Sequence, residues 1–173
     1  MSTPSPPPAN LVLLFSDDGE IPNHPSLPFV CLRVEEVVSS DDPAAWFEER
    51  FVSHDWSATW RWGVYPFPHF HRTAHEVLGV ARGWARLRIG GERGRDLEVA
   101  VGDVLVIPAG VGHQCLEASD DFLVVGAYPG GREPDLVRPP AGPEDRARIA
   151  AVPLPAQDPL HGKFGPLLDH WKV

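Results

Sequence analysis

Two histidines separated by a single residue form the part of this sequence best suited to chemistry. His69 and His71 lie within residues 63–83, and Glu76 follows five residues after His71. Side chains alternate along an extended strand, so both imidazoles would leave the same face with their backbones about 7 Å apart. Imidazole and carboxylate groups together are ligands for iron, manganese, nickel or zinc. The segment therefore predicts part of a site for one divalent metal ion.

A third histidine, His113, completes the candidate ligand set. It follows an apolar run, Val104–Ile107, that ends at Pro108 and a glycine-rich turn able to direct the chain back towards the ion. Three imidazoles and one carboxylate leave open positions on an octahedral ion, which a catalytic site needs and a closed structural site lacks. The alternative is a buried, hydrogen-bonded polar cluster without metal. The predicted metal ligands are His69, His71, Glu76 and His113.

The stretches around these residues resemble the two motifs of the cupin superfamily. The first motif is Gly, five residues, His-x-His, three or four residues, Glu, six residues and Gly, and its fixed positions here are Gly63, His69, His71, Glu76 and Gly83. The second is Gly, five residues, Pro-x-Gly, two residues, His, three residues and Asn, and its matched positions are Gly102, Pro108, Gly110 and His113. Glu117 replaces the Asn, so any role that the family gives that Asn does not transfer. So many fixed positions at the correct spacing make the match specific.

The wider sequence is similar to the YjlB-type bacterial cupins. The similarity includes the segments HEVLGVARGWARLRIGG, GDVLVIPAGVGHQ and VPLPAQDPLHGKFGPLL, and it extends over residues 11–171. It implies an all-β jelly-roll barrel, also called a double-stranded β-helix, with a metal ion in the barrel mouth. This family has no settled reaction, so the resemblance implies no specific function.

His75 complicates the choice of the carboxylate ligand. A three-residue spacer after His71 would place His75 at the ligand position, whereas a four-residue spacer places Glu76 there. Neighbouring residues of a strand face opposite sides, so only one of the two can reach the ion. The six-residue gap from Glu76 to Gly83 favours Glu76. His75 is then expected to face outward and to bond with a neighbour.

Short strands between Gly- and Pro-rich turns predict an antiparallel barrel, which agrees with the resemblance. A helix is expected over residues 43–53, because Asp42 can cap it and Pro43 suits its first position. Its aromatic side chains fall on one face, which would cover a sheet or one end of the barrel. The predicted strands are residues 11–15, 29–34 (at an edge), 57–65, 75–80, 84–89, 97–101, 104–107 and 121–127, and a second short helix is predicted over residues 143–151.

The two ends of the chain are rich in proline and are expected to be extended. We expect a disordered tail over residues 1–10, the barrel with its N-terminal arm over residues 11–131, and a C-terminal arm over residues 132–173. Apolar side chains that alternate with prolines cannot build a separate core, so the arms must dock on the barrel or on a partner. Two-fold dimers are the commonest oligomers, which favours a homodimer over a monomer wrapped in its own arms.

Composition narrows the classes of partner. The net charge of −9 argues against nucleic acid and anionic membrane surfaces as partners, since both attract basic proteins. No apolar run approaches the roughly 18 residues that a membrane-spanning helix needs, and the first residues lack the pattern of a secretory leader. The two cysteines form no disulfide framework. These features predict a cytoplasmic protein whose partner is a small molecule.

The ligand set favours a metal-dependent oxygenase, isomerase or lyase that acts on a small polar metabolite, either anionic or polyhydroxylated. The alternatives are a non-catalytic binding or sensing protein and a scaffold whose metal only stiffens the barrel. Trp60, Trp62, Tyr65 and Phe67 are candidates to flank an aromatic substrate, although such residues commonly belong to a core or to a dimer contact.

Overall fold

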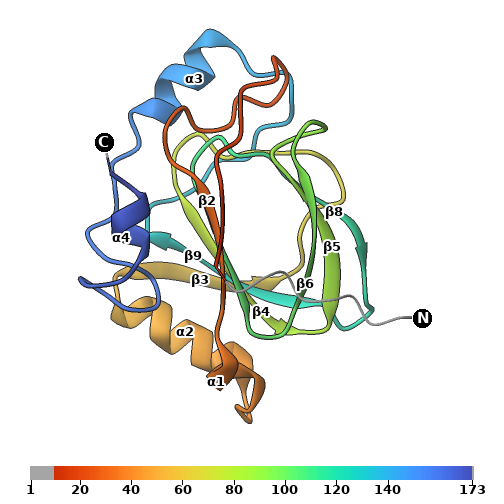
Figure 1. Cartoon of the computed structure of the whole chain (residues 1–173), viewed down its shortest axis with the longest axis vertical. Helices are drawn as coiled ribbons and strands as arrows, with labels where there is room; N and C mark the ends of the chain where they lie inside the picture. Colours follow the sequence, from red (N-terminus) through yellow and green to blue (C-terminus); the bar gives the residue numbers. More distant parts are fainter. Residues whose placement is uncertain (1–9, 173) are drawn as a thin grey trace.

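The structure is a computed structural model that describes residues 10–172. The tail predicted over residues 1–10 therefore lies outside the described residues except for its last one. Two antiparallel sheets face each other as a β-barrel, with short helices at its periphery (Figure 1). This arrangement confirms the predicted all-β jelly-roll class. None of the helices in the described range combines the length and apolar character needed to cross a bilayer.

The larger sheet has six strands and the smaller has three. In spatial order the larger sheet consists of β1 (Leu11–Leu13), β2 (Phe29–Arg33), β7 (Asp103–Ile107), β4 (Glu76–Arg82), β9 (Leu123–Pro129) and β3 (Trp56–Trp62). The smaller sheet consists of β6 (Arg95–Ala100), β5 (Trp84–Ile89) and β8 (His113–Ala118). Both motif segments thus lead into strands at the mouth of one barrel, β4 in the larger sheet and β8 in the smaller.

Alternation along β4 separates the interior of the barrel from its outer face. Leu78 and Val80 point inward and pack in a core between the two sheets, together with Leu87 of β5 and Leu105 of β7. Val77 and its neighbours of the same parity point outward into a second core. Because Glu76 has the parity of Leu78, its carboxylate enters the barrel.

Helix α2 (Pro43–Ser53) covers the outer face of the larger sheet and packs on β3, β4 and β9. Its start is as predicted, because Asp42 Oδ1 accepts a hydrogen bond from the Ala45 N–H at 3.1 Å and Pro43 occupies the first turn. The aromatic face is also confirmed, since Phe47 and Phe51 are fully buried. Gly79 of β4 lies directly beneath the Phe47 ring, where a Cβ would come within 2.6 Å of Phe47 Cγ.

The structure differs from the sequence-based expectations in several local features. β2 is not an edge strand, because it pairs with β1 on one side and with β7 on the other. The sequence did not predict two one-turn helices, α1 (Glu35–Val38), which follows β2, and α4 (Leu167–His170) near the C-terminus. His69 and His71 do not lie in a named strand, since the segment that holds them makes only isolated bridges.

The C-terminal arm docks on the barrel of its own chain. It contains α3 (Pro143–Ala150) and α4 (Leu167–His170), which Figure 1 shows in blue along one side of the molecule. Trp171 is 3% exposed and donates its indole N–H to the Pro28 carbonyl at 2.8 Å. The buried Asp158 carboxylate accepts three backbone N–H bonds and so closes the loop before α4. Most of the apolar surface expected to seek a partner is therefore covered within the chain.

Replacing Gly79 with alanine is expected to destabilise the protein by about 1–3 kcal/mol, because the added methyl group would overpack the contact with Phe47. Urea unfolding measures the loss. Gly63→Ala is the matched control, since a Cβ at Gly63 meets nothing within 4 Å. Equal unfolding midpoints for the two variants would contradict this account of how α2 seats on β4.

Candidate metal centre

The chain crosses the barrel mouth before β4, and this crossing positions two of the histidines. His69 pairs with His113, the first residue of β8, through two backbone hydrogen bonds of 3.2 and 3.0 Å. Phe70, between the two histidines, faces the other way and is fully buried, as its parity predicts. The segment is extended although it does not belong to a regular β-sheet strand. Its successive side chains therefore still point to opposite faces, as expected.

Backbone carbonyl groups fix the rings of His69 and His113. In each case Nδ1 lies next to the carbonyl of the residue two positions earlier, at 3.0 Å from Phe67 O and 3.1 Å from Val111 O. A carbonyl oxygen can only accept, so we assign the proton to Nδ1 in both rings. Each Nε2 then carries a free lone pair. Metal-binding histidines are commonly held in this way.

The C-terminal arm holds the third ring. His71 Nδ1 donates to the carbonyl oxygen of Asp135. The Asp135 carboxylate is itself fixed by Arg72, whose backbone N–H and Nε both donate to it at 2.6 Å. Arg72 also contacts Asp145 of α3 at 2.8 Å. No sequence motif marks Asp135, and the sequence did not predict its role.

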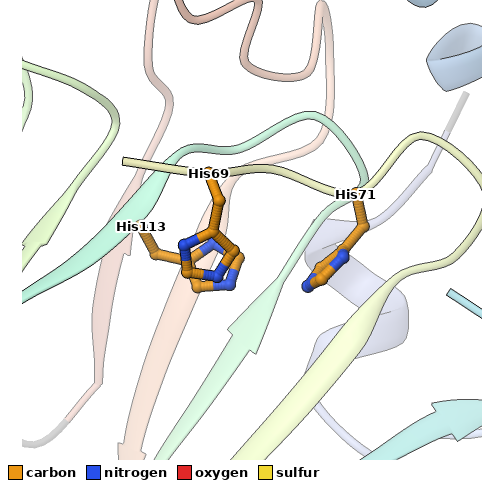
Figure 2. A group of neighbouring side chains, drawn as sticks. All are labelled: His69, His71 and His113. Carbon is orange, nitrogen blue, oxygen red and sulfur yellow. The ribbon is translucent and has the colours of Figure 1, made fainter. Parts of the chain in front are cut away.

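The three imidazoles converge on one point inside the barrel mouth (Figure 2). One nitrogen of each ring can be chosen so that all three lie within 4.8 Å of one another, and all three histidines are buried. Two ligands on opposite sides of a single ion are about 4 Å apart, since each lies about 2 Å from the metal. The spacing, the burial and the free lone pairs all fit one metal ion.

Glu76 adjoins this cluster on one side. Its Oε1 lies 3.3 Å from His113 Nε2, and its Oε2 lies 3.5 Å from His71 Nε2. The compact group of three nitrogens does not itself include the carboxylate. The structure thus brings all four predicted ligands to one place, with Glu76 in contact with two of the three rings.

Burial and mutual contact set the charges of the cluster. Burial, helped by the neighbouring His113, lowers the pKa of His69 to about 3, so this ring is neutral at pH 7. Burial alone would raise the pKa of Glu76, but His71 and His113 outweigh it and hold this pKa below its usual range. The pKa of His71 is raised, because the Glu76 carboxylate outweighs the opposing effect of burial. The carboxylate is therefore ionised and available as a ligand.

His75 is directed away from the three rings. Its Nδ1 accepts a 2.9 Å hydrogen bond from the Ala109 N–H, and its ring packs edge-on against Trp171 at 4.8 Å. The side chain is 1% exposed, because the C-terminal arm covers it. This placement agrees with the strand-parity argument that assigned Glu76 to the interior.

A tyrosine that the sequence did not single out completes the surroundings of Glu76. Tyr128 of β9 donates its hydroxyl to Glu76 Oε2 at 3.0 Å and accepts the Trp60 indole N–H at 2.7 Å. The strand register explains the contact, since Ala127 of β9 lies opposite Val77 of β4. Such a cross-strand contact depends on pairing between distant segments, for which a single sequence carries no signal.

A cavity of about 240 Å³ opens onto the cluster. Three of the four aromatic candidates line it, and the fourth, Phe67, instead stacks on Tyr65 with ring centroids 4.8 Å apart. Besides the four predicted ligands, the lining residues are Trp60, Trp62, Gly63, Val64, Tyr65, Leu78, Tyr128, Pro134, Asp135 and Leu136.

Two solved structures are distant likenesses of this chain. Acireductone dioxygenase from Bacillus anthracis, solved with cadmium in its active centre, matches with a TM-score of 0.40 and 17% identity, over 62% of this chain and 82% of that chain. Oxalate decarboxylase from Bacillus subtilis matches with a TM-score of 0.39 and 18% identity, over 65% of this chain and 28% of that chain. These values are too low to support an argument about function.

Comparison at the sequence level is closer. The family model described as Cupin matches residues 63–128, a range that includes both motifs. The uncharacterized protein YjlB of Bacillus subtilis is 44% identical over 160 residues, which cover 91% of this chain and 93% of that protein. On this identity and coverage, the chain belongs to the YjlB-type cupins.

Proposed function

We propose that this protein is a metal-dependent enzyme that acts on a small molecule at a mononuclear centre formed by His69, His71, Glu76 and His113. The observation that carries the proposal is the convergence of three buried imidazoles whose Nδ1 atoms face backbone carbonyls. A purely structural polar cluster has no need to gather three imidazoles, each held through Nδ1 by a backbone carbonyl group, around one carboxylate.

Iron, manganese, nickel and zinc all suit a donor set of imidazole and carboxylate groups. When bound, such an ion polarises an oxygen ligand at its open positions and so supports oxygenase, isomerase or lyase chemistry. The protein supplies the rest. Asp135 orients His71, while Tyr128 holds the Glu76 carboxylate and places a hydroxyl at the cavity wall.

A non-catalytic binding or sensing protein is the second candidate. One observation favours it: among the described residues, the hydroxyl of Tyr128 and the indole N–H of Trp60 are engaged in hydrogen bonds within the wall. Such a wall binds a ligand without offering a free general base. Oxygen consumption or product formation in a metabolite screen separates the two, because only the enzyme turns its ligand over.

Replacing His71 with alanine is expected to lower metal affinity at least about tenfold. Loss of a residue that only hydrogen-bonds to a metal ligand already costs about tenfold, and loss of the ligand itself should cost more. Elemental analysis of the purified protein, after dialysis against a weak chelator, should find less than half of the wild-type metal content. The control is His161→Ala, which removes an exposed histidine outside the cluster. Equal metal content in wild type and His71→Ala would refute the assigned site.

Glu76 and His75 are expected to behave oppositely. Glu76→Gln should lose metal, because the substitution removes the anionic donor that faces His71 and His113. His75→Gln should keep its metal, because the His75 ring is directed towards Ala109 and Trp171. Metal content per folded protein, with folding checked by circular dichroism, measures both. The reverse pattern would indicate a site with four histidines.

We also propose that the protein forms a homodimer through the outer edge of β1. Val12 and Leu14 are 39% and 61% exposed, on and just after β1, and no strand of residues 10–172 pairs with the outer edge of β1. Exposed apolar edges of this kind favour pairing with a second chain.

Light scattering should find a species of twice the 19.0 kDa chain mass at micromolar concentration. Val12→Lys should shift it towards the monomer, because a charge on an edge strand opposes pairing. Phe164→Lys, at a side chain that is 97% exposed elsewhere, is the matched control. A wild-type species of 19.0 kDa would rule the dimer out.

A further inference from the structure

Away from the histidine cluster, the wall of the cavity is mainly aromatic and aliphatic. Trp60, Trp62 and Tyr65 form one side, and Leu78 and Leu136 contribute aliphatic surface. Trp62 and Leu136 are about half exposed, at 54% and 47%, so they lie at the rim. Aromatic walls of this kind favour flat aromatic ligands, which gain stacking or edge contacts beyond simple burial.

No lysine or arginine of residues 10–172 lines the cavity. The residues outside that range contain neither type, so they cannot add one. A dicarboxylate or a phosphate would therefore enter without a cationic partner for its second charge, and burying an unpaired charge is costly. The arginine nearest in sequence to the His-x-His pair, Arg72, is already paired with Asp135 and Asp145.

Three polar groups of the wall are already engaged in hydrogen bonds within the protein. Trp60 donates to Tyr128, Tyr128 donates to Glu76, and the Asp135 carboxylate accepts from Arg72. A polyhydroxylated ligand would lose hydrogen bonds to water and find few replacements, a loss that lowers its affinity. The polar part of the ligand must therefore lie at the metal, and the remainder must be apolar.

Charge and volume limit the ligand further. A divalent ion with one carboxylate and three neutral imidazoles carries a net charge of about +1, which matches a ligand with a single anionic group. A cavity of about 150 Å³ in a well-studied engineered lysozyme holds benzene. The cavity here, at about 240 Å³, has room for one ring and a short polar end.

We propose that the site takes a monoanionic compound with one oxygen-chelating end and one uncharged aromatic ring, rather than a polyanionic or polyhydroxylated metabolite. This inference rests on the proposed metal function, because the chelating end binds to the ion. The ring lies against Trp60, Trp62 and Tyr65, and the chelating end faces the histidine cluster.

Three 2-hydroxy acids test the inference, because they share a chelating 2-hydroxycarboxylate group and differ only in the substituent attached to it. We expect manganese-loaded protein to bind mandelate, which carries a phenyl ring, about tenfold or more tightly than lactate, which carries a methyl group. Malate, which carries a second carboxylate, should bind no more tightly than lactate. Isothermal titration calorimetry measures the three dissociation constants. Malate binding as tight as that of mandelate overturns the inference.

A substitution at the cavity rim tests whether the absence of a cation there determines the preference between the acids. Leu136→Arg places a cation at the cavity, so it should reduce the preference for mandelate over malate at least about tenfold. Phe164→Arg makes the same charge change at a side chain outside the cavity and should leave the preference unchanged. If Leu136→Arg and Phe164→Arg bind the acids alike, the proposed role of the rim is wrong.

A second set of measurements distinguishes failure of the proposed metal centre from failure of the proposed ligand class. Elemental analysis first measures whether the protein holds manganese at all. If it holds none, benzyl alcohol and glycerol, which lack the chelating carboxylate, test whether the cavity wall prefers an aromatic ligand. Quenching of tryptophan fluorescence measures the binding of each alcohol. Saturable quenching by benzyl alcohol alone supports the aromatic preference, and equal effects of the two alcohols overturn it. A manganese-loaded protein that prefers malate instead overturns the ligand class while the metal centre stands.

Discussion

The pairing of His69 with His113 is the contact on which the site depends. Two backbone hydrogen bonds join segments that are separated by more than forty residues in the sequence, and they set the two rings with centroids 4.1 Å apart. The same pair bridges the mouth between the crossing segment and the smaller sheet. Without it, the crossing segment that holds His69 and His71 would lose this connection to His113 of β8.

The rest of the barrel keeps that mouth rigid. The inner core fixes the separation of the sheets, and the outer core fixes β4 from behind through α2. The absence of a side chain at Gly79 lets Phe47 approach the sheet closely, so the strand that begins at Glu76 is packed on both faces. The backbone that holds the Glu76 carboxylate is therefore already ordered, so fixing this side chain costs little further backbone entropy.

Much of the fold and the gathering of the four proposed ligands could be predicted from the sequence, because both are encoded locally. Spacing along the chain determines strand parity, so His71 and Glu76 could be assigned to the interior and His75 to the opposite face. Tyr128 and Asp135 could not be predicted, because their contacts arise from strand register and from the path of the C-terminal arm. The pairing of β2 on both sides was missed for the same reason, since its partner β7 lies about seventy residues away.

The segment that contains Asp135 and Leu136 has a consequence for how this family can diversify. Asp135 orients the His71 ring through its carbonyl group, and the adjacent Leu136 forms part of the rim of the cavity. A change of backbone path there would move the His71 ring and the cavity rim together. A side-chain substitution at Leu136 changes only the rim, whereas an insertion or deletion in this segment would disturb the histidine cluster as well.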